Sequence, residues 1–368
     1  MFKKIFIYLK NFDWILFTSV ILLTCFGLIE IYSISLGRDV SELVIFKRQV
    51  FFVVIGVILV FVFSFLDHQF FKDYANWLYF LGIILLTSVL FFGTTYSHAT
   101  RWLDLGYFSF QPVEIAKIII IIFLAKLFSS KKIEKDNWRQ LVWSGSLILI
   151  PFLLVLGQPD LGSAILFFVI WLTLVVVSGF NKKYLVIIFL LGVVAFAGMW
   201  NFYFVDYQKQ RILTFINPSE SSLDHRHNVD QSIIAVGAGG LTGSGVGFGS
   251  QSQLKFLPEV ENDFIFAVIA EELGFMGVSL LLIFFSLFFY RCLVNLKKIN
   301  NDFGIFLILG SVGLIFTQMF INIGMNMGIF PVIGLPLPFV SYGGSALISM
   351  FVLVGIIQNI IIKSKINY

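Results

Sequence analysis

The sequence predicts an all-α integral membrane protein with ten transmembrane helices and one large extracytoplasmic loop. Of its 368 residues, 58% are hydrophobic and only 12% are charged, whereas a soluble domain carries about 25% charged residues. The mean hydropathy is +0.94. A net charge of +4, dispersed along the chain, does not indicate a nucleic-acid partner. The two cysteines, Cys25 and Cys292, provide no disulfide framework.

Ten segments have the length and apolar character that a membrane-spanning helix needs, about 20 residues. They cover residues 14–34, 48–66, 76–94, 111–128, 140–157, 161–179, 184–203, 264–290, 304–328 and 340–362. The first follows Lys3, Lys4 and Lys10 but is too long for the apolar part of a signal peptide, and it lacks a small-residue cleavage site. We therefore expect it to be retained as a transmembrane helix.

The positions of Lys and Arg predict the orientation of these helices. Most of the chain's 25 Lys and Arg residues fall in the segments that share a side with the N-terminus, and cytoplasmic loops are the ones enriched in these residues. Both termini are therefore expected to be cytoplasmic. The long segment 201–263 is then extracytoplasmic, and residues 1–368 form a single polytopic membrane domain.

A glycine-rich stretch, residues 236–249, lies within the large loop. Glycines let the backbone adopt positive φ or approach a ligand closely, so the stretch could cradle a phosphate with its amides. No GxxxxGK[ST] motif follows it, which argues against a nucleotide P-loop. The favoured interpretation is a re-entrant or tightly turned segment.

Residues 251–274 pass from a polar loop into an apolar helix, and Asp263 lies at the boundary. Acidic groups at the mouth of a membrane helix are costly unless they are paired or used, which indicates a functional site. Capping of the positive helix N-terminus is the alternative. For Glu259 and Glu261 the two interpretations stay equally open, whereas Asp263 is the principal candidate for function.

Arg101 and Trp102 precede the fourth expected helix on the same side of the membrane as Asp263. The guanidinium could bind an anionic head group, and the indole could stack on a sugar. Anchoring at the membrane interface explains such a pair equally simply and is favoured when the pair is taken alone.

Two further motifs place charges within or beside the expected helices. Glu114 and Lys117 are three residues apart and share a helix face, which predicts an intramembrane ion pair with a mainly structural role, although the pair could also line a polar cavity. Asp160 begins the sixth helix, either as an N-cap or as a cavity-lining carboxylate. Ser341 and Tyr342 precede the last helix and could cap it or contact a head group.

Together these segments resemble the SEDS family of bacterial cell-wall polymerases. The resemblance rests on Arg-Trp at 101–102, QPVE at 111–114, GQPDLG at 157–162, LPEVENDFIFAVIAEELG at 257–274 and PLPFVSYGGS at 336–345. It is closer to the elongation-type (RodA) members than to the division-type (FtsW) members. One departure is Glu261-Asn262, where the family usually has His-Thr before the key aspartate.

The resemblance implies a peptidoglycan glycosyltransferase of the bacterial inner membrane. It would polymerise lipid II at the outer face by inverting transfer and release undecaprenyl diphosphate, with Asp263 as general base. The implied substrate-binding residues are Arg101, Trp102, Glu114, Lys117, Asp160, Glu259, Ser341 and Tyr342. A divalent cation, Mg or Mn, is plausible at the diphosphate. The implied partners are a class B penicillin-binding protein and other elongation-complex membrane proteins.

Other functions remain open at this point: a division-type glycosyltransferase, a flippase or transporter of a lipid-linked precursor, and a scaffold for a partner. Against a transporter, the sequence shows no repeated half with paired broken helices. A partner's membrane helix should dock where small residues allow close contact. On this basis the pairs Gly310/Gly313 and Gly324/Gly328 predict a docking face on the ninth helix.

Overall fold

The computed structural model describes residues 2–36, 43–96, 99–104, 106, 109–130, 137–216, 223–254 and 260–366. The helices and strands in chain order are α1 (Phe2–Asn11), α2 (Trp14–Leu36), α3 (Leu43–Phe65), α4 (His68–Phe92), β1 (Thr94–Tyr96), β2 (Ala99–Asp104), β3 (Ser109–Phe110), α5 (Pro112–Ser129), α6 (Trp138–Leu156), α7 (Leu161–Val177), α8 (Lys182–Phe202), α9 (Asp206–Ile216), α10 (Leu223–Ala238), α11 (Ser250–Gln253), α12 (Ile265–Leu296), α13 (Asp302–Asn326) and α14 (Gly344–Ile366).

All ten predicted membrane helices are present. In the described part of the chain, eight helices are long and apolar enough to cross a membrane. The other two of the ten are α7, which has 17 residues, and α5, whose 18 residues include three charged side chains. The sequence did not predict the small antiparallel sheet β1-β2-β3 between α4 and α5, which carries Arg101 on its middle strand.

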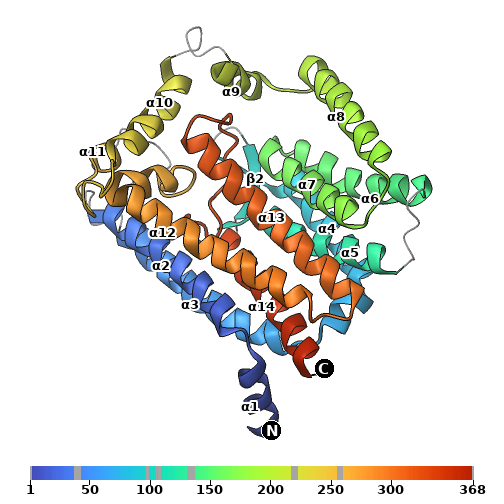
Figure 1. Ribbon diagram of the computed structural model, residues 1–368. Helices are drawn as coiled ribbons and strands as arrows, with labels where there is room; N and C mark the ends of the chain where they lie inside the picture. Colours follow the sequence, from blue (N-terminus) through green and yellow to red (C-terminus); the bar gives the residue numbers. More distant parts are fainter. Residues whose placement is uncertain are drawn as a thin grey trace.

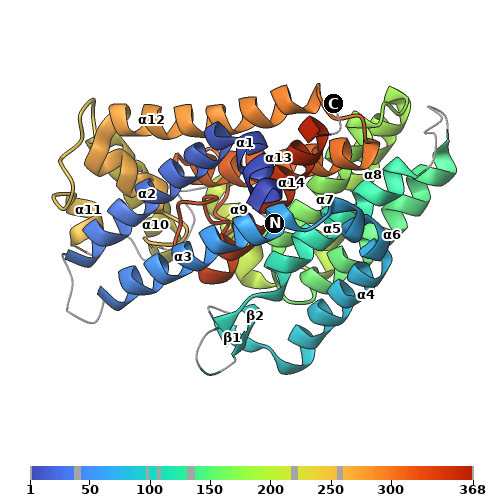
Figure 2. The same cartoon turned by 90° about the horizontal axis from the view of Figure 1, so that it is seen from below.

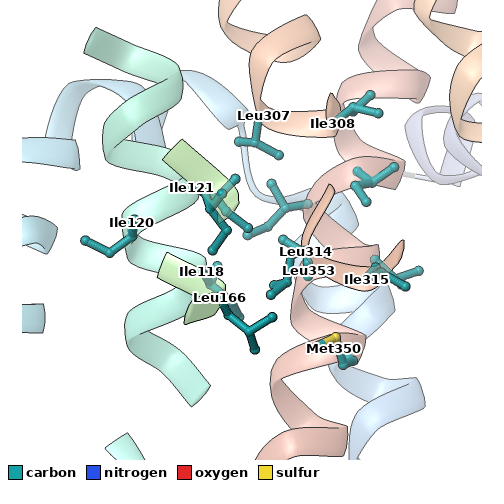
Figure 3. Packing of buried hydrophobic residues seen from close by; sticks show 14 of the residues in the cluster. Ile118, Ile120, Ile121, Leu166, Leu307, Ile308, Leu314, Ile315, Met350 and Leu353 are labelled. Atoms are coloured by element: carbon teal, nitrogen blue, oxygen red, sulfur yellow. The ribbon is translucent and has the colours of Figure 1, made fainter. Parts of the chain in front are cut away.

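The centre of the molecule is formed by α5, α13 and α14, with α3, α4 and α7 packed around them (Figure 1). An isoleucine run, residues 118–122, makes the middle of α5 apolar on all sides, as expected for a helix surrounded by protein. Figure 3 shows Ile121 of α5 facing Leu307 and Leu314 of α13 in this core. In Figure 2, α2 runs between α3 and α12, and it packs against both.

Helix α8 lies apart from this bundle (Figure 1). None of its residues is buried, and a methyl group added at Gly192 or Gly198 would meet no atom within 4 Å. Its chain continues directly into α9, which begins the large loop segment. The two elements are therefore held by far fewer contacts than α5 or α14.

The glycine-rich stretch folds back tightly onto α12, as the favoured interpretation predicted. The backbone of α12 is interrupted at Gly274, where φ is 62°. The freed amides of Phe275 and Met276 donate to the carbonyl oxygens of Gly240 and Leu241. A side chain at Gly239 would collide with the carbonyl oxygen of Ala270, so the close approach requires glycine there.

Both termini lie at one end of the bundle, and α9, α10 and α11 lie at the other (Figure 1). We call these ends the terminal side and the loop side. The four glycines predicted to form a docking face on the ninth helix face side chains of this chain, whereas docking of a partner on that helix stays a prediction. Gly310 meets Ile121, and Gly313 meets Thr173 of α7. Gly324 and Gly328 meet Phe330 and Ile233 in the same way.

Candidate functional site

Asp263 lies on the loop side, in the turn that leads into α12, and its side chain is partly exposed. Its backbone carbonyl oxygen accepts hydrogen bonds from the side-chain amides of Asn322 and Asn326, each at 3.0 Å. These two asparagines are one turn apart on α13 and fully buried. They fix the backbone that presents the Asp263 carboxylate.

The same turn is also held from the segment that precedes α14. The Ser341 hydroxyl donates to the carbonyl oxygen of Asn262 at 2.6 Å, and the Tyr342 amide donates to that of Glu261 at 2.8 Å. Ser341 and Tyr342 therefore bind the Asp263 turn and do not cap α14, which begins at Gly344. Their predicted contact with a head group stays a prediction.

Gly334 lies close to both Asp263 and Arg211 of α9, a basic residue that was not singled out from the sequence. A methyl group added at Gly334 would lie 3.3 Å from Asp263 Oδ2 and 3.9 Å from Arg211 Nη1. Gly334 has a φ of 69°, which favours glycine. The Arg211 guanidinium also donates to the carbonyl oxygen of Val332 at 3.3 Å. A carboxylate and a guanidinium therefore share the space beside this glycine.

Arg101 reaches the same region from strand β2. Its Nη2 donates to the carbonyl oxygen of Pro159 at 3.2 Å, and its Nε lies 3.6 Å from Asp160 Oδ2. Asp160 is buried and caps α7, one of the two roles considered for it, because its oxygens accept from the amide and hydroxyl of Ser163. The Nε atom of Arg101 is buried and makes no hydrogen bond. Trp102 follows on β2 and is partly exposed.

A small surface pocket lies between these elements. Its lining comprises two arginines, one glutamine and four apolar residues, namely Arg101, Arg211, Gln208, Pro159, Leu161, Ile212 and Ile333. Guanidinium groups on an otherwise apolar wall suit an anionic group joined to a hydrocarbon chain. Residue Gly334, which meets Asp263, directly follows the lining residue Ile333.

The predicted intramembrane ion pair is present. Lys117 Nζ lies 2.9 Å from both carboxylate oxygens of Glu114, and the two side chains are 1% and 3% exposed. The hydroxyl of Ser349 donates to the same carboxylate at 3.3 Å. Neither residue lines the pocket. Their predicted contact with substrate is therefore not tested by this geometry, and Glu259 lies outside the described residues.

The acidic residues after Asp263 anchor the glycine-rich stretch. Glu271 accepts hydrogen bonds from the amides of Gln251 and Ser252, and Glu272 accepts from the amide of Gly247. The hydroxyl of Ser33 on α2 also donates to Glu272. These bonds hold residues 247–252 against α12.

Sequence reasoning missed Arg211, Gln208, Asn322 and Asn326. The asparagines carry a readable signal, since two amides one turn apart in an apolar helix are costly unless they are used. Arg211 carries no such signal in the sequence. It is one of several cations in a long loop, and only the fold brings it to Arg101.

A separate polar cluster lies on the terminal side, and we call it the terminal cluster. Asp13 accepts hydrogen bonds from Arg291 Nη2 and Asn295 Nδ2, both at 2.6 Å. Gln358 accepts from the Asp13 amide and donates to its carbonyl oxygen. Burial raises the pKa of Asp13, but the hydrogen bonds from Arg291 and Asn295 outweigh this effect and hold the pKa below its ordinary value. The cluster joins α2, α12 and α14.

The fold and the site define a polytopic α-helical membrane protein with a polar pocket on the loop side. The chain belongs to the FtsW/RodA/SpoVE family, described as cell cycle proteins, whose profile matches residues 13–366.

Curated relatives match along nearly the whole chain. The chain is 37% identical to "Peptidoglycan glycosyltransferase MrdB" of Escherichia coli K12, over 97% of this chain and 95% of the relative. It is 35% identical to "Stage V sporulation protein E" of Bacillus subtilis, over 95% and 96% of the two chains.

Solved structures share the fold. One, from a study of how a peptidoglycan synthase complex coordinates polymerization and crosslinking, has a TM-score of 0.81 and 28% identity, covering 96% of this chain and 98% of the other. The rod shape determining protein RodA of Thermus thermophilus has a TM-score of 0.72 and 27% identity, covering 97% and 98%.

Proposed function

We propose that this protein is an elongation-type peptidoglycan glycosyltransferase, which polymerises lipid II into glycan strands at the outer face of the bacterial cytoplasmic membrane. The observation that carries the proposal is that Asp263 and Arg211 both lie close to Gly334, beside the arginine-lined pocket. The names of the relatives support it, since MrdB is a peptidoglycan glycosyltransferase and RodA a shape-determining protein.

The chemistry needs a base and a stabilised leaving group. An acceptor sugar hydroxyl attacks the anomeric carbon of the donor from the face opposite the diphosphate, so the configuration inverts. The Asp263 carboxylate accepts the hydroxyl proton. The bond from the anomeric carbon to the diphosphate oxygen breaks, and its electron pair leaves with undecaprenyl diphosphate. Positive charge placed at that oxygen lowers the barrier.

The expected Mg or Mn ion at the diphosphate stays a prediction. Within the described residues, no group of three or more His, Cys, Asp or Glu side chains could hold a metal ion. Arg101 and Arg211 are positively charged side chains that line the pocket.

The orientation and the partner belong to the same proposal. The polymerase acts at the loop side, so this side faces outward and both termini are cytoplasmic. The partner we propose is a class B penicillin-binding protein that crosslinks the glycan, acting with other elongation-complex proteins. The resemblance to a chain from a peptidoglycan synthase complex supports this pairing.

The decisive experiment is polymerisation of lipid II by the purified protein in detergent, with the glycan product resolved on a gel. Detergent removes the second compartment, so a flippase or transporter would leave lipid II unchanged. We expect glycan polymer from the protein together with a class B penicillin-binding protein. Absence of polymer from the purified, folded complex would contradict the proposal.

A further inference from the structure

The leaving diphosphate must meet positive charge or amide donors, and the sequence offers three sources: Lys117, the glycine-rich amides and Arg101. The structure argues against the amides as donors to the diphosphate. The amide of Gly243 donates to Gly239, that of Gly245 to the backbone of Glu272, and that of Gly247 to the Glu272 carboxylate, at 2.8 to 3.0 Å. These donors already have partners within the protein, so they do not form an open nest.

Lys117 is also an unfavourable candidate for binding the diphosphate. Its ammonium contacts both Glu114 oxygens at 2.9 Å, and only 1% of its side chain is exposed. To bind a diphosphate it would have to leave Glu114 as a buried charge without its cation, which is strongly unfavourable. Arg101 is different, because its Nε makes no hydrogen bond and its side chain lines the pocket.

Arg211 lines the same pocket as Arg101. Arg101 comes from strand β2 and Arg211 from α9, and Gln208 lies one helical turn before Arg211. Residues three apart on a helix share a face, so the glutamine and the arginine both reach the pocket. Asp160, whose Oδ2 lies 3.6 Å from Arg101 Nε, also accepts two hydrogen bonds from Ser163.

We infer that Arg211, together with Arg101, binds the diphosphate of the polyprenyl-linked substrate, with Gln208 as a further hydrogen-bond donor. This inference rests on the proposed function and extends it to a residue of the large loop. Guanidinium groups form paired hydrogen bonds with phosphate oxygens. Leu161, Ile212 and Ile333 then contact the first units of the hydrocarbon chain.

The position of Arg211 also couples the two halves of the reaction. Its guanidinium lies beside Gly334, which the Asp263 carboxylate also approaches. When the bond to the anomeric carbon breaks, the electron pair moves onto the diphosphate oxygen that the arginines contact. The proton of the attacking hydroxyl moves to Asp263 on the other side of the same space. Arg211 therefore stabilises the leaving group close to the base.

The test is equilibrium binding of a fluorescent polyprenyl diphosphate to the purified full-length protein in detergent. A polyprenyl monophosphate with the same chain serves as the comparison ligand. Arg211→Ala should weaken diphosphate binding about 10- to 100-fold, the range for a hydrogen bond to a charged group. Arg211→Lys should recover part of the loss, and the monophosphate should be less affected.

Lys209→Ala is the matched control, because it removes one positive charge from α9 at a position that does not line the pocket. Its diphosphate binding should equal that of the wild type. Equal binding by Arg211→Ala and the wild type would overturn the inference, and so would an equal loss from Lys209→Ala. If Arg211→Ala is not monodisperse, Gln208→Ala, with an expected loss of several-fold, decides in its place.

The outcome separates this inference from the proposed function. Binding is also measured in Asp263→Asn protein, where diphosphate affinity should persist while polymerisation is lost. Arg211-dependent diphosphate binding without any polymer from the wild-type complex would contradict the glycosyltransferase proposal alone. Normal polymer with Arg211-independent diphosphate binding would contradict the inference alone.

Discussion

Buried polar groups occur at both ends of the bundle, and the two ends differ in how their hydrogen bonds are used. In the terminal cluster, the Asp13 carboxylate accepts from Arg291, Asn295 and the Leu16 amide, and Gln358 bonds both backbone groups of Asp13. On the loop side, Arg101 keeps a buried nitrogen without a hydrogen bond at the wall of a pocket.

This difference separates two uses of polar groups in an apolar protein. A buried charge whose bonds are all made within the protein holds helices together, since breaking it leaves its partner unsatisfied. A charge at a pocket wall with bonding capacity left is available to a ligand. Changes to the terminal cluster should therefore alter stability, and changes at the pocket should alter turnover.

The largest effect is expected at Asp263. Asp263→Asn and Asp263→Ala should reduce glycan polymerisation about 10²- to 10⁴-fold, the usual contribution of a general base. The thermal unfolding midpoint in detergent should change little, because the backbone carbonyl, not the carboxylate, bonds Asn322 and Asn326. A twofold loss of activity would be too small for this role.

The Glu114–Lys117 pair should behave as a structural unit. Glu114→Ala or Lys117→Ala alone should destabilise the protein by about 3–5 kcal/mol, because each leaves a buried charge without its partner. The double change should cost less than either single change. Chemical denaturation of the purified variants measures this. A double variant worse than both singles would show that the two residues are not a simple ion pair.

Asp13 should contribute to stability in a pH-dependent way. The pKa of the folded state is lowered, so its contribution is complete above the ordinary value of about 3.9 and is lost as the pH falls through the lowered folded value. Asp13→Asn should therefore lower the free energy of unfolding at pH 7 by about 1–3 kcal/mol, because charged hydrogen bonds are lost. Below about pH 4 the difference in unfolding free energy between Asp13→Asn and the wild type should shrink. A difference that does not change with pH would contradict a stabilising role for the Asp13 carboxylate.

The smallest effect is expected at the exposed pair Asp67–Lys363 on the terminal side. The two side chains lie 2.8 Å apart, and Asp67 is 48% exposed. Burial raises the pKa of Asp67, but the hydrogen bonds from Lys363 and the Gln69 amide lower it overall. Because water screens the pair, Lys363→Met should cost less than about 1 kcal/mol. A loss of unfolding free energy as large as that of Asp13→Asn would contradict the distinction between buried and exposed pairs.

The sequence predicted the helices and several local pairings because those features depend on neighbouring residues. A run of apolar residues defines a membrane helix, the three-residue spacing defines Glu114–Lys117, and Asp160 directly precedes the helix that it caps. The same local reasoning identified the glycine-rich stretch as a tight turn.

The sequence could not predict which helix faces meet, because lipid and protein interior are both apolar. Hydrophobic periodicity therefore does not separate an inward face of α13 from an outward one, and two of the glycines assigned to a partner face Ile121 and Thr173. Arg101 and Arg211 are also far apart in the chain, and each alone resembles an ordinary interfacial cation. Only the path of α9 over the bundle brings them to one pocket.

One paired measurement tests the central distinction between the two polar regions. Lipid II polymerisation per folded molecule and the unfolding midpoint are measured together for the wild type, Asp263→Asn and Asp13→Asn. We predict that Asp263→Asn loses turnover about 10²- to 10⁴-fold with an almost unchanged midpoint. We also predict that Asp13→Asn unfolds at a lower temperature while its folded fraction keeps normal turnover. An Asp263→Asn protein that polymerises at the wild-type rate would contradict the account.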